Sequence, residues 1–466
     1  MELFSEINPK NNNVALINEL GEVTLYSELF YKREELSEYF KNRSVTLFLT
    51  NNSIDSIIIY LTLLQSGSVP VLIDSNISNQ FIQSLIKSYN PDYIVSLKKN
   101  KLHFDDFESS ELTSNYNLYT SKNTKQAITN IDLCLLLTTS GSTGSPKLVR
   151  LTYKNILENT KSICQYLGLS NNDRAITSLP MNYSFGLSVI QTHLYVGASI
   201  LVTNNSIIEK DFWNLVADLN VTFLSGVPFT YEVLEKIKFR NKELHNLKYL
   251  VQAGGKLNVN LIEIFAKDSL AKNRKFFVMY GQTEATARMS YLPYENCLRK
   301  LGSIGIAIPN GKFTLIDDES NIINESNKTG ELVYEGPNVS LGYADSRNDL
   351  DLGDQNNGKL FTGDLATKDE EGYFYIVGRK KRFIKLFGNR TNLDEIEQLL
   401  KSDAMDCACT GTDDNLLVYI TDSLIDVNDL KKYISIKLKI HYSVISIFYI
   451  KDIPKNTSGK INYQLL

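Results

Sequence analysis

The chain has 466 residues, and its 53 acidic side chains outnumber its 49 lysines and arginines, which gives a net charge of −4. Its length predicts two or more domains, and its 43% hydrophobic and 22% charged residues are typical of globular proteins and not of disordered ones. The charge excludes a global electrostatic field that would hold nucleic acid or an anionic membrane, so any anion must be bound locally.

The chain carries no recognisable targeting or membrane signal. Its first residues lack the basic and apolar regions of a signal peptide, and the longest apolar stretch, residues 57–64, is too short for a membrane span. We therefore expect no membrane span and a cytoplasmic protein. Five cysteines in so long a chain predict no disulfide framework, and Cys407 and Cys409 are expected to pack on one strand face.

The first part of the chain alternates strand-like and helical segments. Strands are expected at 45–49 and 68–73 and a helix at 79–89, which is the pattern of a parallel α/β sheet. The pattern continues with strands at 198–202, 221–225 and 247–251, each beside a helical segment. These predict a second doubly wound α/β subdomain.

A loop rich in serine, threonine and glycine follows a buried strand at 131–137 and ends on Pro146-Lys147. Ligands bind at the carboxyl ends of strands in such sheets. Glycines can turn backbone N–H groups toward an anion, hydroxyls add donors, and Lys147 adds a positive charge, so the loop suits a polyphosphate. It is not a Walker A loop, because the lysine follows Gly144 by three positions and comes after a proline. A flexible surface connector is the alternative.

The residue pattern changes after about residue 302, where short strand-like segments and turn residues predict a small β-barrel-like subdomain. Beyond the basic residues 379–382, a helix from about residue 393 and strands at 416–421 and 444–450 predict a small mobile α+β domain. The expected fold is thus α/β and multidomain, with an N-terminal domain over 1–380 and a C-terminal domain over 381–466.

The segment Thr-Thr-Ser-Gly-Ser-Thr-Gly-Ser-Pro-Lys at 138–147 resembles the signature of the adenylate-forming superfamily, which includes acyl-CoA synthetases, adenylation domains and firefly luciferase. Further motifs follow in the family's order at 280–284, 361–364, 378–379 and 454–460. The resemblance runs over essentially the whole chain and implies an AMP-binding enzyme that uses ATP and Mg²⁺.

The resemblance also implies a set of nucleotide-site residues. The phosphate loop would comprise Thr139, Ser140, Gly141, Ser142, Thr143, Gly144 and Lys147. Thr283 would contact the α-phosphate and Glu284 would hold Mg²⁺, for which a carboxylate oxygen is a suitable ligand. Tyr280, with Gly254 and Gly255, would hold adenine, and Gly281 would belong to the ATP site. Asp364 would bind the ribose, and Arg379 would be a ribose or a domain-closure contact. Core packing for Tyr280 and a turn aspartate for Asp364 are the alternatives.

The family's C-terminal residues imply the two chemical steps. Lys460 would bridge the carboxylate and the α-phosphate during adenylation, although alone it could be a solvated tail residue. Lys381 would be the hinge for rotation of the small domain, and Lys385 and Gly388 would serve the thiol step. Leu148 replaces the family's usual glycine, which predicts a stiffer end of the phosphate loop. The C-terminal domain is short, so the acceptor stays open between CoA and an acyl carrier protein.

The acyl pocket is expected near residues 179–188. Amino-acid-activating members of the family usually carry Phe-Asp where this chain has Phe185-Gly186, so no aspartate pairs with a substrate ammonium. We therefore expect an acid without an α-amino group. The candidate pocket residues are Tyr183, Phe185, Gly226 and Phe229, for which core packing is the alternative.

The sequence thus predicts an ATP-dependent carboxylic acid ligase that forms acyl-AMP, releases pyrophosphate and makes a thioester, with CoA placed ahead of a carrier protein as the acceptor. An acyl-carrier-protein ligase that loads a phosphopantetheine arm is the first alternative. A non-catalytic nucleotide-binding homologue is the second.

Overall fold

The computed structural model describes residues 2–123, 129–138, 147–386, 389–402, 405–413, 415–438, 440–455 and 461–466. The chain divides into two compact units, one formed by Met1–Lys312 with Tyr334–Leu360 and the other by Phe313–Val333 with Phe361–Leu466. The larger unit is α/β and the smaller is α+β, so the predicted fold class is confirmed. A domain boundary between residues 380 and 381 stays a prediction.

The first sheet of the larger unit has eight strands and a parallel centre. Its order is β20 (Gly342–Ala344), β9 (Leu148–Thr152), β8 (Leu133–Thr138), β4 (Val69–Asp74), β3 (Val45–Thr50), β5 (Tyr93–Leu97), β7 (Tyr116–Ser121) and β6 (Phe107–Glu111). Its edge strands are antiparallel, whereas the sequence pattern predicted a parallel sheet. Side chains alternate along β3, so that Leu47 and Leu49 enter one core and Phe48 the other, and both faces are covered.

The second sheet of the larger unit has nine strands, of which the central ones are parallel. Its order is β16 (Ile306–Ala307), β15 (Ser290–Leu292), β14 (Lys275–Tyr280), β13 (Tyr249–Gln252), β12 (Phe223–Gly226), β10 (Arg174–Ile176), β11 (Ser199–Leu201), β1 (Val14–Ile17) and β2 (Val23–Leu25). The predicted strands near 198–202, 221–225 and 247–251 are present within two residues at either end.

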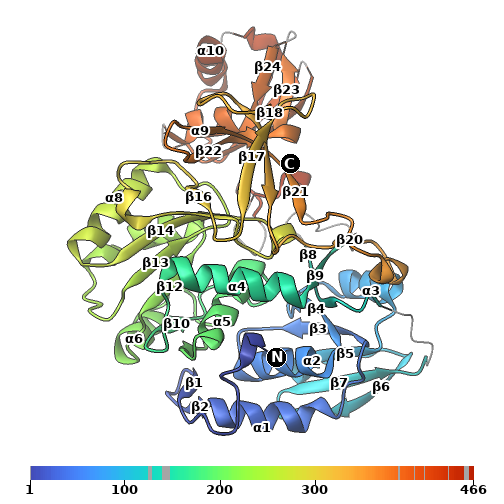
Figure 1. The fold of residues 1–466 in the computed structure, drawn as a ribbon. Helices are drawn as coiled ribbons and strands as arrows, with labels where there is room; N and C mark the ends of the chain where they lie inside the picture. The colour runs from blue at the N-terminus through green and yellow to red at the C-terminus, as the bar shows by residue number, and fades with distance from the viewer. Residues whose placement is uncertain are drawn as a thin grey trace. The chain divides into compact units, whose positions relative to one another are not determined.

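Helices cover both sheets of the larger unit: α1 (Tyr26–Ser37), α2 (Ile54–Ser66), α3 (Asn79–Tyr89), α4 (Tyr153–Leu167), α5 (Ser184–Tyr195), α6 (Lys210–Asp218), α7 (Pro228–Lys236) and α8 (Val259–Ala271). Figure 1 shows α4 running between the two sheets, and Ile156 on α4 shares one core with Leu135 of β8 and Leu187 of α5. The apolar stretch 57–64 lies within α2 and is buried. None of the helices that the structure describes has the length and apolar character that a membrane crossing needs.

The smaller unit consists of short sheets and two helices. The strands of the first sheet are β18 (Ile322–Ile323), β17 (Lys312–Ile316), β19 (Gly330–Glu335), β21 (Lys359–Lys368) and β22 (Phe374–Arg379). A hairpin joins β23 (Phe383–Leu386) to β24 (Asn389–Asn392), and a third sheet contains β25 (Cys407–Thr412), β26 (Asn415–Ile420) and β27 (Ile445–Tyr449). The helices are α9 (Leu393–Ser402) and α10 (Val427–Leu438). Cys407 and Cys409 are fully buried in one core, which confirms packing as their role.

Candidate active site

Three neighbouring parallel strands place predicted adenine and acyl-pocket residues at one edge of the second sheet. Strands β12, β13 and β14 pair in parallel, so their carboxyl ends lie together. Gly226 ends β12, Gly254 follows β13, and Tyr280 ends β14. Gly254 has φ of 86°, in the left-handed region, and a Cβ atom there would lie 2.5 Å from Tyr183 Oη. Only glycine allows this close approach.

The predicted acyl-pocket residues differ in their exposure. Tyr183 precedes α5 and meets Phe185 edge to face, with ring centroids 6.3 Å apart. Phe185 is 3% exposed, whereas Phe229, at the start of α7, is 45% exposed. Burial raises the pKa of Tyr183 to about 12, so its hydroxyl stays neutral. A Cβ atom on Gly186 would lie 2.2 Å from the Pro180 carbonyl oxygen, so no side chain fits there.

The loop after β14 is held in a strained conformation. Ala287 has φ of 103°, a value that non-glycine residues rarely adopt. Two hydrogen bonds from the Asn338 amide, to the carbonyl oxygens of Ala285 at 2.8 Å and Arg288 at 3.2 Å, fix the loop. The Thr286 hydroxyl donates in turn to the Asn338 carbonyl oxygen at 2.7 Å. Asn338 belongs to none of the sequence motifs, so sequence reasoning missed it.

Tyr343 connects Glu284 with the lysine at the end of the phosphate loop. Its hydroxyl donates to Glu284 Oε1 at 2.6 Å, and Lys147 Nζ lies 4.1 Å from the centroid of its ring. Burial, with the Glu284 carboxylate beside it, raises the pKa of Tyr343, which keeps the hydroxyl protonated as a donor. Thr283 is adjacent, with its Oγ1 3.3 Å from Ser184 Oγ. We call Lys147, Tyr343 and Glu284 the Tyr343 cluster.

The structure places Asp364 and Arg379 together in the smaller unit. Asp364 on β21 is 3% exposed and pairs across the sheet with Arg379 on β22, and Arg379 Nε lies 3.2 Å from its carboxylate. Gly363 has φ of 69° and precedes the aspartate. A carboxylate is an acceptor with several lone pairs, which is the chemistry that a diol requires.

Several predicted site residues lie outside the described residues or have side chains that the structure does not describe. Thr139, Ser140, Gly141, Ser142, Thr143, Gly144, Gly388 and Lys460 lie outside the described residues. The side chains of Lys381 and Lys385 are not described. The roles of these residues stay predictions.

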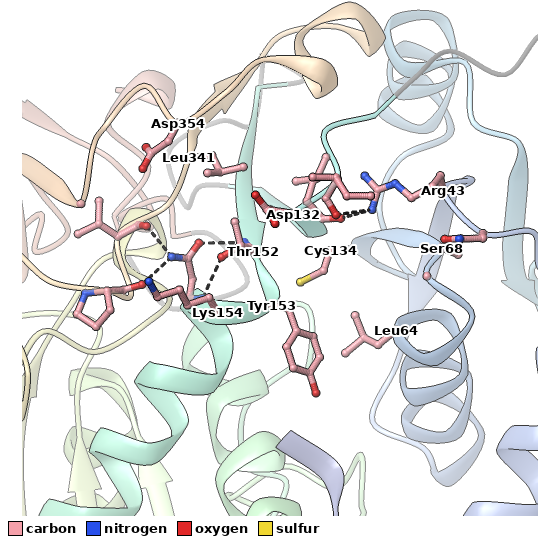
Figure 2. A pocket seen from close by; sticks show the side chains of 18 of the residues that line it. Arg43, Leu64, Ser68, Asp132, Cys134, Thr152, Tyr153, Lys154, Leu341 and Asp354 are labelled. Carbon is pink, nitrogen blue, oxygen red and sulfur yellow. Dashed lines mark hydrogen bonds between the residues drawn. The ribbon is translucent and has the colours of Figure 1, made fainter. Parts of the chain in front are cut away.

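A cavity of about 680 Å³ opens at the other end of the β8–β9 pair (Figure 2). Arg43, Cys134 and Tyr153 are among its lining residues, and none of the predicted site residues lines it. Its lining also includes Val339 and Leu341, which flank Ser340, and the Ser340 N–H donates to the Glu284 carbonyl oxygen at 2.8 Å.

The donor set near Glu284 fits a magnesium ion held mainly by substrate phosphates. Mg²⁺ is commonly bound by one or two carboxylates with phosphates and water completing its shell. Glu284 supplies one carboxylate, oriented by Tyr343. Within the described ranges, no group of three or more His, Cys, Asp or Glu side chains forms a dedicated metal cage.

The sequence and the fold resemble those of known AMP-binding enzymes. The family model described as AMP-binding enzyme matches residues 6–344. A 2-succinylbenzoate–CoA ligase of Oceanobacillus iheyensis is 28% identical over 394 residues, which cover 83% of this chain and 80% of that protein.

Solved structures show the same fold. The o-succinylbenzoate coenzyme A synthetase of Bacillus subtilis in complex with AMP has a TM-score of 0.83 at 21% identity, covering 100% of this chain and 98% of that one. The same enzyme in complex with ATP and a magnesium ion has a TM-score of 0.79 at 22% identity, covering 99% and 98%.

Proposed function

The chain belongs to the AMP-binding enzyme family and is an acid–thiol ligase, and on that premise we propose that it joins a carboxylic acid without an α-amino group to coenzyme A, through an acyl-AMP intermediate. The observation that carries the proposal is the Tyr343 cluster, in which a lysine and an oriented carboxylate lie together beside Thr283. A cation for phosphates and a carboxylate for a metal are what a magnesium–nucleotide complex requires.

In the first step, an oxygen of the substrate carboxylate attacks the α-phosphorus of ATP, and pyrophosphate leaves with the electrons of the broken P–O bond. Lys147 and the phosphate loop hold the β- and γ-phosphates, and the Thr283 hydroxyl donates to the α-phosphate. Glu284 would hold Mg²⁺, which, when bound, offsets negative charge on the phosphates. Lys460 approaches both the carboxylate and the α-phosphate and lowers the repulsion between them.

Each unit carries residues that the family motifs assign to the nucleoside. Tyr280 offers its ring to one face of adenine, and the backbone at Gly254 and Gly255 contacts the other. The Asp364 carboxylate, which pairs with Arg379, accepts from the two ribose hydroxyls. Binding of the nucleoside orients the α-phosphorus toward the acid.

In the second step, the thiolate of CoA attacks the acyl carbonyl carbon, and AMP leaves from the resulting tetrahedral intermediate. Rotation at Lys381 would bring Lys385 and Gly388 to the site for this step. CoA is favoured over a carrier protein because a relative that matches over 83% of the chain is named a CoA ligase.

The acid lacks an α-amino group in this proposal because none of the candidate pocket residues, Tyr183, Phe185, Gly226 and Phe229, can supply an anion to pair with an ammonium. Gly186 stands where an aspartate would be needed, and the Pro180 carbonyl leaves no room for any side chain there. A buried ammonium without a partner is strongly unfavourable. Acids without this charge are therefore bound in preference.

Acid-dependent exchange of pyrophosphate into ATP tests this function. The enzyme is assayed with pooled aliphatic, aryl and hydroxy acids and with amino acids, and Lys460→Ala serves as the inactive variant. We expect exchange with a non-amino acid that collapses in the variant, and formation of an acyl-CoA when CoA is added. Saturable exchange with a proteinogenic amino acid alone, or transfer only to a carrier protein, would contradict the proposal.

A further inference from the structure

Arg288 is a buried cation beside the proposed acyl pocket. It follows the short helix η4 (Thr283–Ala285), and only 1% of it is exposed. Its guanidinium carbon lies 5.0 Å from the centroid of the Phe185 ring, and Phe185 is one of the candidate pocket residues. A guanidinium beside a ring gains cation–π attraction, which replaces only part of the hydration that the charge loses on burial.

Two of the three guanidinium nitrogens of Arg288 have no hydrogen-bond partner in the part of the chain that the structure describes. These are Nε and Nη2. The third, Nη1, donates to the Tyr166 hydroxyl at 3.4 Å and to Met279 Sδ at 3.5 Å. Nε and Nη2 form one edge of the guanidinium, and their parallel N–H bonds match the two oxygens of a carboxylate.

Three titratable groups that interact electrostatically with Arg288 are neutral near pH 7. Burial raises the pKa of Cys164 to about 12, and burial also raises the pKa of Tyr166. Burial lowers the pKa of His193 to about 4, so its ring is uncharged. None of these groups supplies a negative charge to the guanidinium.

Arg150 shows how this chain satisfies a buried arginine that has a structural role. It is also fully buried, and each of its three nitrogens donates to an oxygen. Its acceptors are the carbonyls of Tyr343, Leu341, Leu352 and Gly353 and the Gln355 side chain. Arg288 lacks such a set among the described residues, so its Nε–Nη2 edge keeps the capacity to donate to an acceptor.

We propose that Arg288 binds a second anionic group of the acid, and that the preferred substrates are therefore dicarboxylic acids. The inference rests on the proposed function: one carboxylate is activated on the α-phosphorus, while the other accepts from Nε and Nη2 of Arg288. Phe185 lies beside this cation and contacts the part of the substrate that joins the two carboxylates. The same positive charge repels an α-ammonium group, which agrees with the absence of an aspartate at Gly186.

The test compares each diacid with its monomethyl ester, which keeps the skeleton and one carboxylate but loses the second charge. Pyrophosphate exchange is measured for aliphatic and aryl pairs with the wild-type enzyme and with Arg288→Met and Arg288→Lys. We expect kcat/KM to favour the best diacid over its ester by on the order of 10- to 100-fold, the range of a charged hydrogen bond. Arg288→Met should remove this preference mainly through KM, and Arg288→Lys should restore part of it.

Arg274→Met is the matched control. Arg274 is 7% exposed, its guanidinium carbon lies 5.9 Å from the Phe239 ring centroid, and Nη1 has no partner among the described residues. It precedes β14 at the end opposite Tyr280, so its loss should leave the diacid-to-ester ratio unchanged. Circular dichroism and thermal melting check that each variant is folded.

The outcomes separate this inference from the proposed function. Exchange with monocarboxylic acids or esters that matches or exceeds exchange with every diacid would overturn the role of Arg288 while leaving the ligase function intact. The wild-type ratio alone decides this point if Arg288→Met fails to fold. If no acid supports exchange, the proposed function fails. The inference about Arg288 is then tested by binding: the melting temperature of the enzyme is measured with ATP and either the diacid or its monomethyl ester. The inference is supported if the diacid raises the melting temperature of Arg274→Met but not that of Arg288→Met. It is overturned if the diacid raises the melting temperature of the two variants equally.

Discussion

Gly281 is needed because the strained loop after β14 passes against it. A Cβ atom at this position would lie 1.7 Å from the Ala287 carbonyl oxygen. We predict that Gly281→Ala displaces the loop that carries Thr283 and Glu284. Misplacement of these catalytic groups should lower the exchange rate at least about 100-fold. Overpacking should destabilise the fold by about 1–3 kcal/mol. Exchange kinetics and urea unfolding measure the two effects.

Gly353→Ala is the control for this prediction. A Cβ atom on Gly353 meets no atom within 4 Å, so this variant should behave as the wild type. An active Gly281→Ala enzyme with unchanged KM for ATP would show that the loop is not part of the nucleotide site.

Tyr343 is predicted to orient the carboxylate that holds the metal. Tyr343→Phe removes the hydroxyl that donates to Glu284 but keeps the ring beside Lys147. The loss of one hydrogen bond to a charged acceptor predicts an increase of about 10-fold in KM for magnesium–ATP. Titrations of ATP and Mg²⁺ in the exchange assay measure this.

Tyr375→Phe provides the comparison, because the Tyr375 hydroxyl also donates to a carboxylate, that of Asp369 at 3.2 Å. This pair belongs to no predicted site, so its loss should not change the magnesium dependence. Equal effects of the two substitutions would refute a specific role for Tyr343.

Arg382 joins several elements of the smaller unit. It pairs with Asp394 at 2.5 Å and Glu397 at 2.6 Å on α9, donates to the Cys409 carbonyl on β25, and lies 3.8 Å from the Tyr463 ring centroid. Its side chain is only 13% exposed, although the basic run 379–382 suggests an exposed linker. Removal would take the arginine from the Asp394 carboxylate and would leave the Glu397 carboxylate with Lys401, at 3.6 Å, as its cation.

We predict that Arg382→Ala lowers the free energy of unfolding of the smaller unit by about 3–5 kcal/mol, the usual effect of breaking a buried ion pair. Hydrogen exchange of β25 and β26 would measure it. The exposed pair of Lys432 with Asp429 on α10 gives the control, because Lys432→Ala should change stability by no more than about 0.5 kcal/mol. Unchanged protection in Arg382→Ala would contradict this account.

Elements formed from local patterns were predicted well, and elements that depend on distant partners were not. The helix at 79–89 is α3 with the same bounds, because its apolar spacing and its N-cap Ser78 are local signals. Strand β1 pairs with β11, and β20 pairs with β9, over separations of more than 180 residues. No local pattern encodes such pairings, so strands β1, β9 and β20 of the larger unit were missed.

The residues of the candidate site also divide into those with a local sequence signal and those without one. Motif residues such as Tyr280, Glu284 and Asp364 were recognised because their spacing is characteristic of the family. Tyr343, Asn338 and Arg288 were missed because they act through contacts that only the fold creates. A polar residue outside any motif has no sequence signal that separates it from an ordinary surface or core residue.

At the scale of the whole molecule, a buried neutral histidine predicts how stability depends on pH. Burial lowers the pKa of His193 from 6.5 to about 4. Below pH 6.5 the unfolded chain binds a proton that the folded chain does not bind until about pH 4, so stability falls as the pH is lowered through this window. The shift corresponds to about 3 kcal/mol.

His193→Gln should therefore lose less stability between pH 6.5 and pH 4 than the wild type, as measured by urea unfolding at a series of pH values. His103, whose side chain is 87% exposed, is the control, and His103→Gln should keep the wild-type slope. If the unfolding free energy of His193→Gln falls between pH 6.5 and pH 4 as steeply as that of the wild type, other groups account for the loss of stability in acid.

The most direct measurement of the central claim is a single turnover without a thiol. Enzyme, magnesium–ATP and the acid selected by exchange are mixed and quenched, and the products are identified by mass. The account predicts acyl-AMP and pyrophosphate in about equal amounts, with acyl-AMP converted to acyl-CoA when CoA is added. Cleavage of ATP to ADP and phosphate, or ATP binding without acyl-AMP for any acid, would contradict it.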